Sequence, residues 1–74
     1  MKEYLVDGKR IAKDFVYHPP KDDQAERYAA MRKNAGDLAS QIMKMTPASR
    51  EQSTALTKLD EVVFWANAAI ARNE

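Results

Sequence analysis

The chain has 74 residues, no cysteine, one histidine and a formal net charge of +1, from 12 basic and 11 acidic residues. A chain of this length forms one domain with a thin core, and its stability requires disulfides, a metal, oligomerisation or very regular helix packing. The composition excludes disulfides and thiolate metal sites, and the balanced charge disfavours a protein that binds duplex nucleic acid.

Residues 1–18 are predicted to form a short β-ribbon followed by a loop. Two β-capable runs, Glu3–Val6 and Lys9–Ala12, flank Asp7-Gly8. An Asp-Gly pair in this position is a strong hairpin signal, because both turn residues must tolerate a positive φ. A two-stranded ribbon is marginal alone, so we expect it to pack against helices or a neighbouring subunit. His18-Pro19-Pro20 then predicts an extended segment.

Residues 19–74 are predicted to form an antiparallel helical hairpin, which makes the protein mainly α. The first helix is expected to begin between Pro20 and Asp23, where carboxylates favour a helix N-terminus, and to end at Thr46-Pro47. Its apolar positions alternate at three- and four-residue steps, the pattern of a heptad seam: Tyr28, Met31, Ala35, Leu38, Ile42 and Met45.

The second helix is predicted to run from Ser49 to about Arg72. Ser49-Arg-Glu-Gln52 fits a capping box, and Thr46 before Pro47 is an alternative N-cap. One apolar stripe consists of Leu56, Leu59, Val63, Ala66 and Ile70. A second stripe consists of Ala55, Val62, Trp65 and Ala69. The first helix can cover one stripe, so we expect the other to be covered in a homo-oligomer.

Catalysis finds little support in the sequence. His18 lies in a proline-bounded loop without an evident orienting partner, and Asp60 and Glu61 are adjacent, so they face different directions on a helix. We expect no catalytic residue, no metal ligand and no cofactor. No run is long enough to span a membrane and no signal peptide is evident, so we expect a soluble intracellular protein without membrane contact.

Binding finds more support, in four side chains. Tyr17 is an aromatic on a loop and could stack on a base, and Arg32 could pair with a phosphate. Asn67 is an amide in an alanine-rich turn that either fixes the register of an oligomer or hydrogen-bonds a ligand. Arg72 either complements the helix dipole or contacts an anion.

The string Pro47-Ala-Ser-Arg-Glu51, followed by the helix from Ala55 through Trp65-Ala-Asn-Ala-Ala-Ile-Ala-Arg72 to Asn73, resembles a family of small phage proteins. These are the cyclic-oligonucleotide sponges that counter the CBASS and Thoeris defence systems of bacteria. The resemblance covers roughly residues 17–74, and the string from Trp65 to Arg72 is its most specific part.

The resemblance implies a function and an assembly. Family members sequester host second messengers without cleaving them, and they assemble as hexamers that are trimers of dimers. Their pockets take cyclic dinucleotides or glycosylated cyclic ADP-ribose between subunits, and cyclic trinucleotides near the three-fold axes. For this chain the resemblance implies a phage or prophage anti-defence protein that acts in the host bacterial cytoplasm. The alternative is a non-enzymatic helical hairpin that binds another protein in a structural or regulatory role.

The resemblance also implies site residues. In relatives that bind cyclic dinucleotides, a tyrosine before the first helix stacks on a base, and a lysine fifteen residues later contacts a phosphate. Tyr17 and Arg32 have this spacing, with arginine keeping the charge. Arg50, Asn67 and Arg72 resemble family positions near the ends of the hairpin and complete the expected ligand-binding set.

Overall fold

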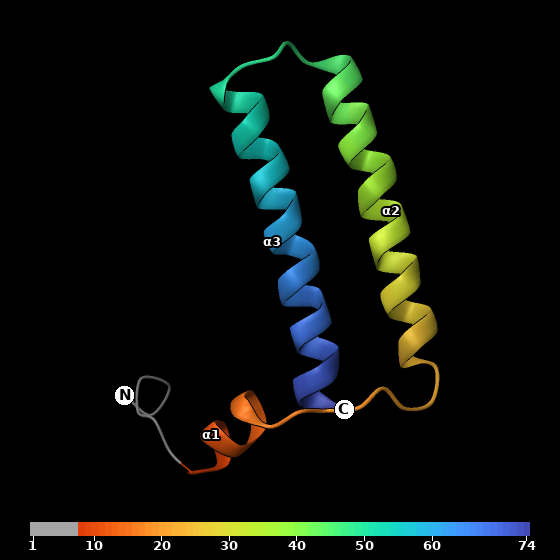
Figure 1. Cartoon of the computed structure of the whole chain (residues 1–74), viewed down its shortest axis with the longest axis vertical. Coiled ribbons are helices and arrows are strands. Elements are labelled where there is room, and N and C mark those ends of the chain that lie inside the picture. Colours follow the sequence, from red (N-terminus) through yellow and green to blue (C-terminus); the bar gives the residue numbers. More distant parts are fainter. Residues whose placement is uncertain (1–7) are drawn as a thin grey trace.

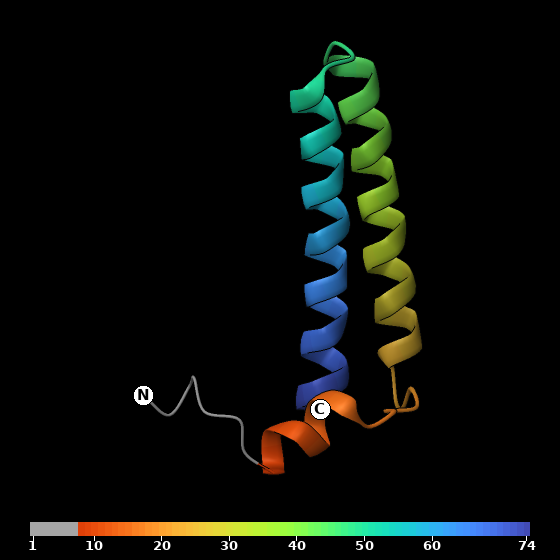
Figure 2. The ribbon, with the colours of Figure 1, turned by 60° about the vertical axis from the view of Figure 1, so that its left-hand side comes forward.

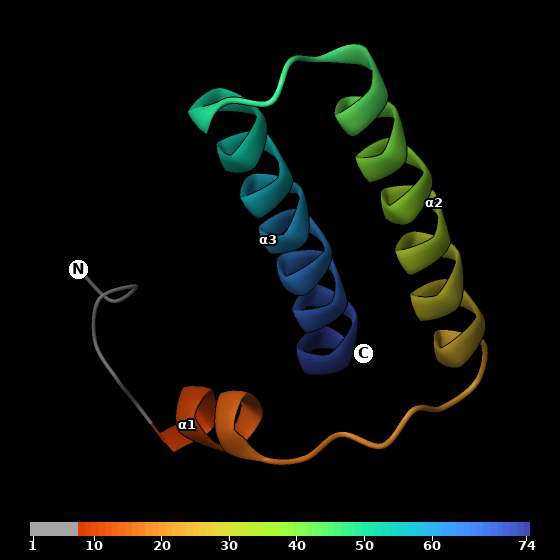
Figure 3. The ribbon, with the colours of Figure 1, turned by 45° about the horizontal axis from the view of Figure 1, so that its top comes forward.

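The computed structural model describes residues 8–74, which form the helices α1 (Gly8–Phe15), α2 (Gln24–Met45) and α3 (Arg50–Asn73). Helices α2 and α3 lie side by side and run antiparallel, joined by a short turn, and α1 lies at the opposite end of the hairpin, beside the end of α3 (Figure 1 and Figure 2). The linker of residues 16–23 crosses this open end to reach α2 (Figure 3). The predicted helical hairpin is confirmed.

The predicted β-ribbon is wrong in the part that the structure describes. Lys9–Ala12 belongs to α1, while Glu3–Val6 lies outside the described residues, and no strand occurs within residues 8–74. Helical spacing brings Arg10 Nε to 3.5 Å from Asp14 Oδ2, and such i,i+4 ion pairs favour a helix. Lys13 of α1 also donates to Asn73 of α3. The turn signal at Asp7-Gly8 carries no information about such a contact between distant parts of the chain.

The turn between α2 and α3 is fixed by side chains that bind exposed backbone groups. Ser49 caps α3 as predicted, since its Oγ accepts a hydrogen bond from the backbone N–H of Gln52 at 3.0 Å. The Gln52 side chain does not make the predicted return contact; its Nε2 donates to the Thr46 carbonyl at 3.0 Å. Thr46 is the C-cap of α2, so its alternative role as the N-cap of α3 is wrong. Gln52 therefore links the two helices.

Helices α2 and α3 cover each other along one stripe. The first stripe of α3 is half-buried as predicted, at Leu56, Leu59, Val63, Ala66 and Ile70. On α2 the half-buried apolar positions are Tyr28, Ala35, Ala39 and Ile42. The predicted seam is wrong at its other three positions, because Met31, Leu38 and Met45 are exposed. A straight helix drifts away from a strict heptad repeat, so the contact follows Ala39 instead.

The second stripe of α3 remains uncovered in the single chain. Val62 is 58% exposed and Trp65 is 61% exposed, and Ala55 and Ala69 are exposed as well. Within residues 8–74 no hydrophobic residue is buried, and the buried residue there is polar, Gln24 at 3% exposure. None of the helices in this part of the chain combines the length and the apolar character needed to cross a membrane. The hairpin alone lacks an apolar core.

We expect Ser49→Ala to lower the free energy of unfolding by about 1 kcal/mol, because it leaves the Gln52 amide at the start of α3 without its acceptor. Urea unfolding followed by circular dichroism measures the change. Ser40→Ala, at an exposed position within α2, serves as the control and is expected to stabilise slightly, since alanine has the better helix propensity. An equal loss of stability in both variants would contradict the capping role.

Candidate functional site

A groove at the open end of the hairpin collects side chains from α1, the linker, α2 and α3. We call it the linker groove; it has a volume of about 520 Å³. Three aromatic side chains line it: Tyr17 from the linker, Tyr28 from α2 and Phe64 from α3. Tyr17 is 79% exposed, so its ring is available to an incoming planar group. This volume lies within the usual range of small-molecule pockets.

Charged side chains line the same groove. Arg32 of α2 is exposed and makes no ion pair or hydrogen bond through its side chain with any residue of 8–74. Arg72 of α3 is half-buried, and its Nε lies 3.7 Å from Asp14 Oδ1 of α1. Asp14 is thus shared between Arg72 and Arg10. The groove presents two guanidinium groups, one of which is partly neutralised.

Asn67 is the fourth predicted site residue in the linker groove. It is half-buried on α3, and its side-chain oxygen is buried without a hydrogen-bond partner in the described part of the chain. A buried amide oxygen without a donor is unfavourable by about 1–3 kcal/mol, so a ligand or a second chain that donates to it would be bound favourably. The structure therefore places a free acceptor beside the two arginines.

Arg50 lies apart from this group. It is the first residue of α3, at the turn end of the hairpin, and it lines a separate hollow with Glu51, Thr54 and Ala55. Four of the five predicted residues thus come together from three segments of the chain, and the fifth lies at the opposite end of α3. No site within one chain can contain all five.

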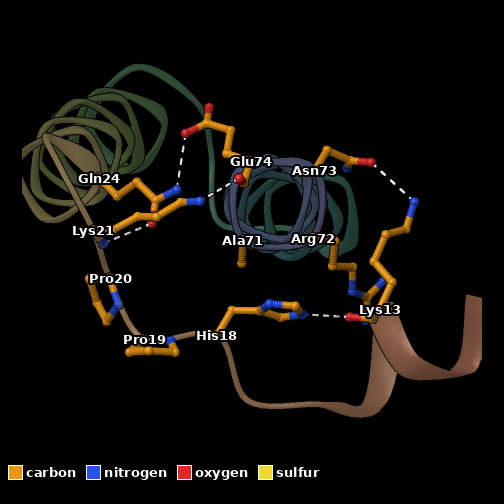
Figure 4. A pocket seen from close by; sticks show the side chains of 10 residues that line it. All are labelled: Lys13, His18, Pro19, Pro20, Lys21, Gln24, Ala71, Arg72, Asn73 and Glu74. Carbon is orange, nitrogen blue, oxygen red and sulfur yellow. Dashed lines mark hydrogen bonds between the residues drawn. The ribbon is translucent and has the colours of Figure 1, made fainter. Parts of the chain in front are cut away.

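A second hollow adjoins the linker groove and contains the contacts that hold the open end together (Figure 4). Lys13 Nζ donates to Asn73 Oδ1 at 3.2 Å, which ties α1 to α3. His18 Nε2 donates to the Lys13 carbonyl at 2.7 Å, which folds the linker back on α1. Arg72 extends from α3 toward α1 in this view. These contacts position Tyr17, which directly precedes His18.

The carboxylate of Glu74 joins α2 to the end of α3. Arg27 donates to it through two nitrogens, with Nη1 2.8 Å from Oε2, and Gln24 Nε2 donates to Oε1 at 3.0 Å. The hydrogen bond from Arg27, followed by that from Gln24, lowers the pKa of Glu74 to about 2. The hydrogen bond with Glu74 also raises the pKa of Arg27. Lys21 Nζ adds a bond to the Glu74 main-chain oxygen at 2.5 Å.

The sequence did not single out Asp14, Phe64 or the Arg27–Glu74 pair. Tyr28 belongs to the predicted helix seam and also lines the linker groove. The spacing of Arg10 and Asp14 is a helical ion-pair signal that could have indicated α1. The pairing of Arg27 with Glu74 joins residues far apart in the chain, so no local pattern contains it.

A family model described as Acb2/Tad1, hairpin domain, matches residues 7–71, which is most of the chain. No curated protein matches the chain significantly, and no solved structure does.

We expect Glu74 to titrate near pH 2 in the folded protein, below its ordinary pKa of 4.5. Because the folded-state pKa is the lower one, the stabilisation is present above pH 4.5 and is lost as the pH falls from 4.5 toward 2. Arg27→Gln should move the titration midpoint toward 4.5, as measured by NMR of the Glu74 carboxylate carbon. Lys33→Gln, remote from Glu74, should leave it unchanged; a wild-type midpoint near 4.5 would contradict the pairing.

Proposed function

The chain belongs to the Acb2/Tad1 hairpin-domain family, whose members are sponges against CBASS and Thoeris defence, and we propose that it sequesters a cyclic oligonucleotide in the linker groove. Its ligands are cyclic dinucleotides, cyclic trinucleotides or glycosylated cyclic ADP-ribose, bound without cleavage. Family membership makes this a binding protein. By holding the messenger in the host cytoplasm, the protein keeps the defence effector inactive.

One observation carries the proposal: Tyr17, Arg32, Asn67 and Arg72 line one groove although they come from three separate segments. Together they supply three kinds of interaction that a cyclic nucleotide requires. An exposed tyrosine ring stacks on a base, a contribution of about 1–3 kcal/mol, and the guanidinium groups pair with phosphates. The unpartnered oxygen of Asn67 can accept from an exocyclic amine or a ribose hydroxyl.

Self-association is the second part of the proposal. The uncovered stripe at Val62 and Trp65, together with the lack of buried hydrophobic residues in 8–74, supports a homo-oligomer in which other copies cover α3. We propose the trimer of dimers, a homo-hexamer. In a symmetric dimer each groove residue occurs twice, which suits the two halves of a cyclic dinucleotide. Arg50 then contributes from another copy, because it lies far from the other four residues of its own chain.

We expect Tyr17→Ala and Arg32→Gln each to weaken binding at least about fivefold, because they remove a stacking surface and a phosphate contact. Isothermal titration of the pure protein against cyclic dinucleotides, cyclic trinucleotides and glycosylated cyclic ADP-ribose measures this. Lys33→Gln removes a neighbouring cation that is paired with Asp37 outside the groove, and it should bind as the wild type does. Recovery of intact ligand after denaturation separates sequestration from hydrolysis. If none of these compounds binds, the proposal is wrong.

We expect Trp65→Glu to convert the oligomer into smaller species, because it places a charge in the exposed apolar stripe. Sedimentation velocity measures the change. Thr57→Glu, on the exposed side of α3 away from both stripes, is the control and should keep the wild-type mass. Val63 and Ile70 do not suit this test, because they are half-buried against α2 and a polar residue there would unfold the hairpin. A wild-type protein that sediments as a monomer would contradict the proposed assembly.

A further inference from the structure

We propose that Asp14 is an internal competitor of the ligand's phosphate: it holds the Arg72 guanidinium in the unliganded groove and thereby limits affinity for anions. The inference rests on the proposed function of the linker groove and assigns a role to α1, which the proposal above does not use. Asp14 is a positioning residue in this scheme, since it acts on the ligand through Arg72.

The geometry supports competition more than a fixed structural bond. Arg72 Nε and Asp14 Oδ1 are 3.7 Å apart, beyond ordinary hydrogen-bond distance, and both side chains line the groove. The Asp14 side chain is 19% exposed and that of Arg72 is 33% exposed, so the pair is accessible from the groove. A phosphate oxygen can approach the same guanidinium with better geometry, in a bidentate arrangement.

Asp14 also has a second partner, which makes the exchange feasible. Arg10 Nε lies 3.5 Å from its other carboxylate oxygen, within α1. When a phosphate pairs with Arg72, the Asp14 carboxylate still pairs with Arg10 and therefore retains a counter-ion. The attachment of α1 to α3 also survives in part, because Lys13 still donates to Asn73.

The net charge of the groove predicts that neutralising Asp14 raises the affinity for an anionic ligand. Arg32, Arg72 and Asp14 line it, so their formal charges sum to +1, while a cyclic dinucleotide carries two negative charges. Replacing Asp14 with asparagine raises that sum by one charge at constant side-chain shape. The interaction free energy of a partly exposed ion pair is small, and it corresponds to about a two- to fivefold change in affinity. The gain should shrink at high salt, as screening weakens the attraction.

The experiment is a titration of wild type, Asp14→Asn, Arg72→Gln and the double variant against cyclic di-AMP and the remaining compounds of the panel above. Asp14→Asn should bind about two- to fivefold tighter than wild type. In the Arg72→Gln background, Asp14→Asn should give less than half of that gain in binding free energy, because Asp14 acts through Arg72. Asp37→Asn makes the same change in net charge outside the groove and should leave affinity unchanged.

The outcomes separate this inference from the function on which it rests. Binding by wild type with no gain in Asp14→Asn, or an equal gain in Asp37→Asn or in the Arg72→Gln background, overturns the role of Asp14 and leaves sequestration intact. No binding by any variant overturns both. A gain in affinity that is specific to Asp14→Asn and depends on Arg72 supports the inference. This holds even if the wild type binds too weakly to measure and only Asp14→Asn binds detectably. Circular dichroism spectra and melting curves establish that each variant is folded.

Discussion

A hairpin of two helices can cover only one stripe of each, and this constraint shapes the rest of the molecule. Ala35 and Ala39 of α2 meet the Leu56 to Ile70 stripe of α3, yet no hydrophobic residue within 8–74 becomes buried. Apolar packing alone therefore does not fix how the two helices lie. Polar contacts at the two ends supply the missing constraints: Gln52 ties α3 to Thr46 at the turn, and Glu74 ties α3 to Arg27 at the open end.

These constraints produce the linker groove at the open end. Glu74 holds the end of α3 against the start of α2, and Gln24, the buried residue of the described chain, joins that contact to the Lys21 amide. The linker must cross this end to reach α1, and His18 fixes its course through the Lys13 carbonyl. Tyr17 consequently lies over the same groove as Arg32 and Arg72, although its side chain is itself largely exposed.

Features that depend on residues close together in the chain could be predicted from the sequence. The helical hairpin, the Ser49 cap and the inner stripe of α3 follow from turn residues and periodicity, and the structure confirms them. The predicted β-ribbon is wrong over Lys9–Ala12, because the Asp7-Gly8 turn signal is local whereas the contacts between α1 and α3 join residues far apart in the chain. Family spacing implies ligand-binding roles for Tyr17 and Arg32; both line the linker groove, and the roles themselves stay predictions. Asp14 was not foreseen, because its significance depends on Arg72, far along the chain.

The proposed assembly surface and the proposed binding groove meet on α3, at two adjacent aromatic residues. Phe64 lines the linker groove and Trp65 belongs to the uncovered stripe, and their rings form an edge-to-face pair with centroids 5.2 Å apart at 89°. Such a pair favours this ring orientation by about 0.5–1.5 kcal/mol, so constraining one ring constrains the other. In the proposed homo-oligomer, a second copy that packs on Trp65 would therefore order Phe64 in the groove as well as cover the apolar stripe. Such pre-organisation would reduce the entropy loss that accompanies ligand binding.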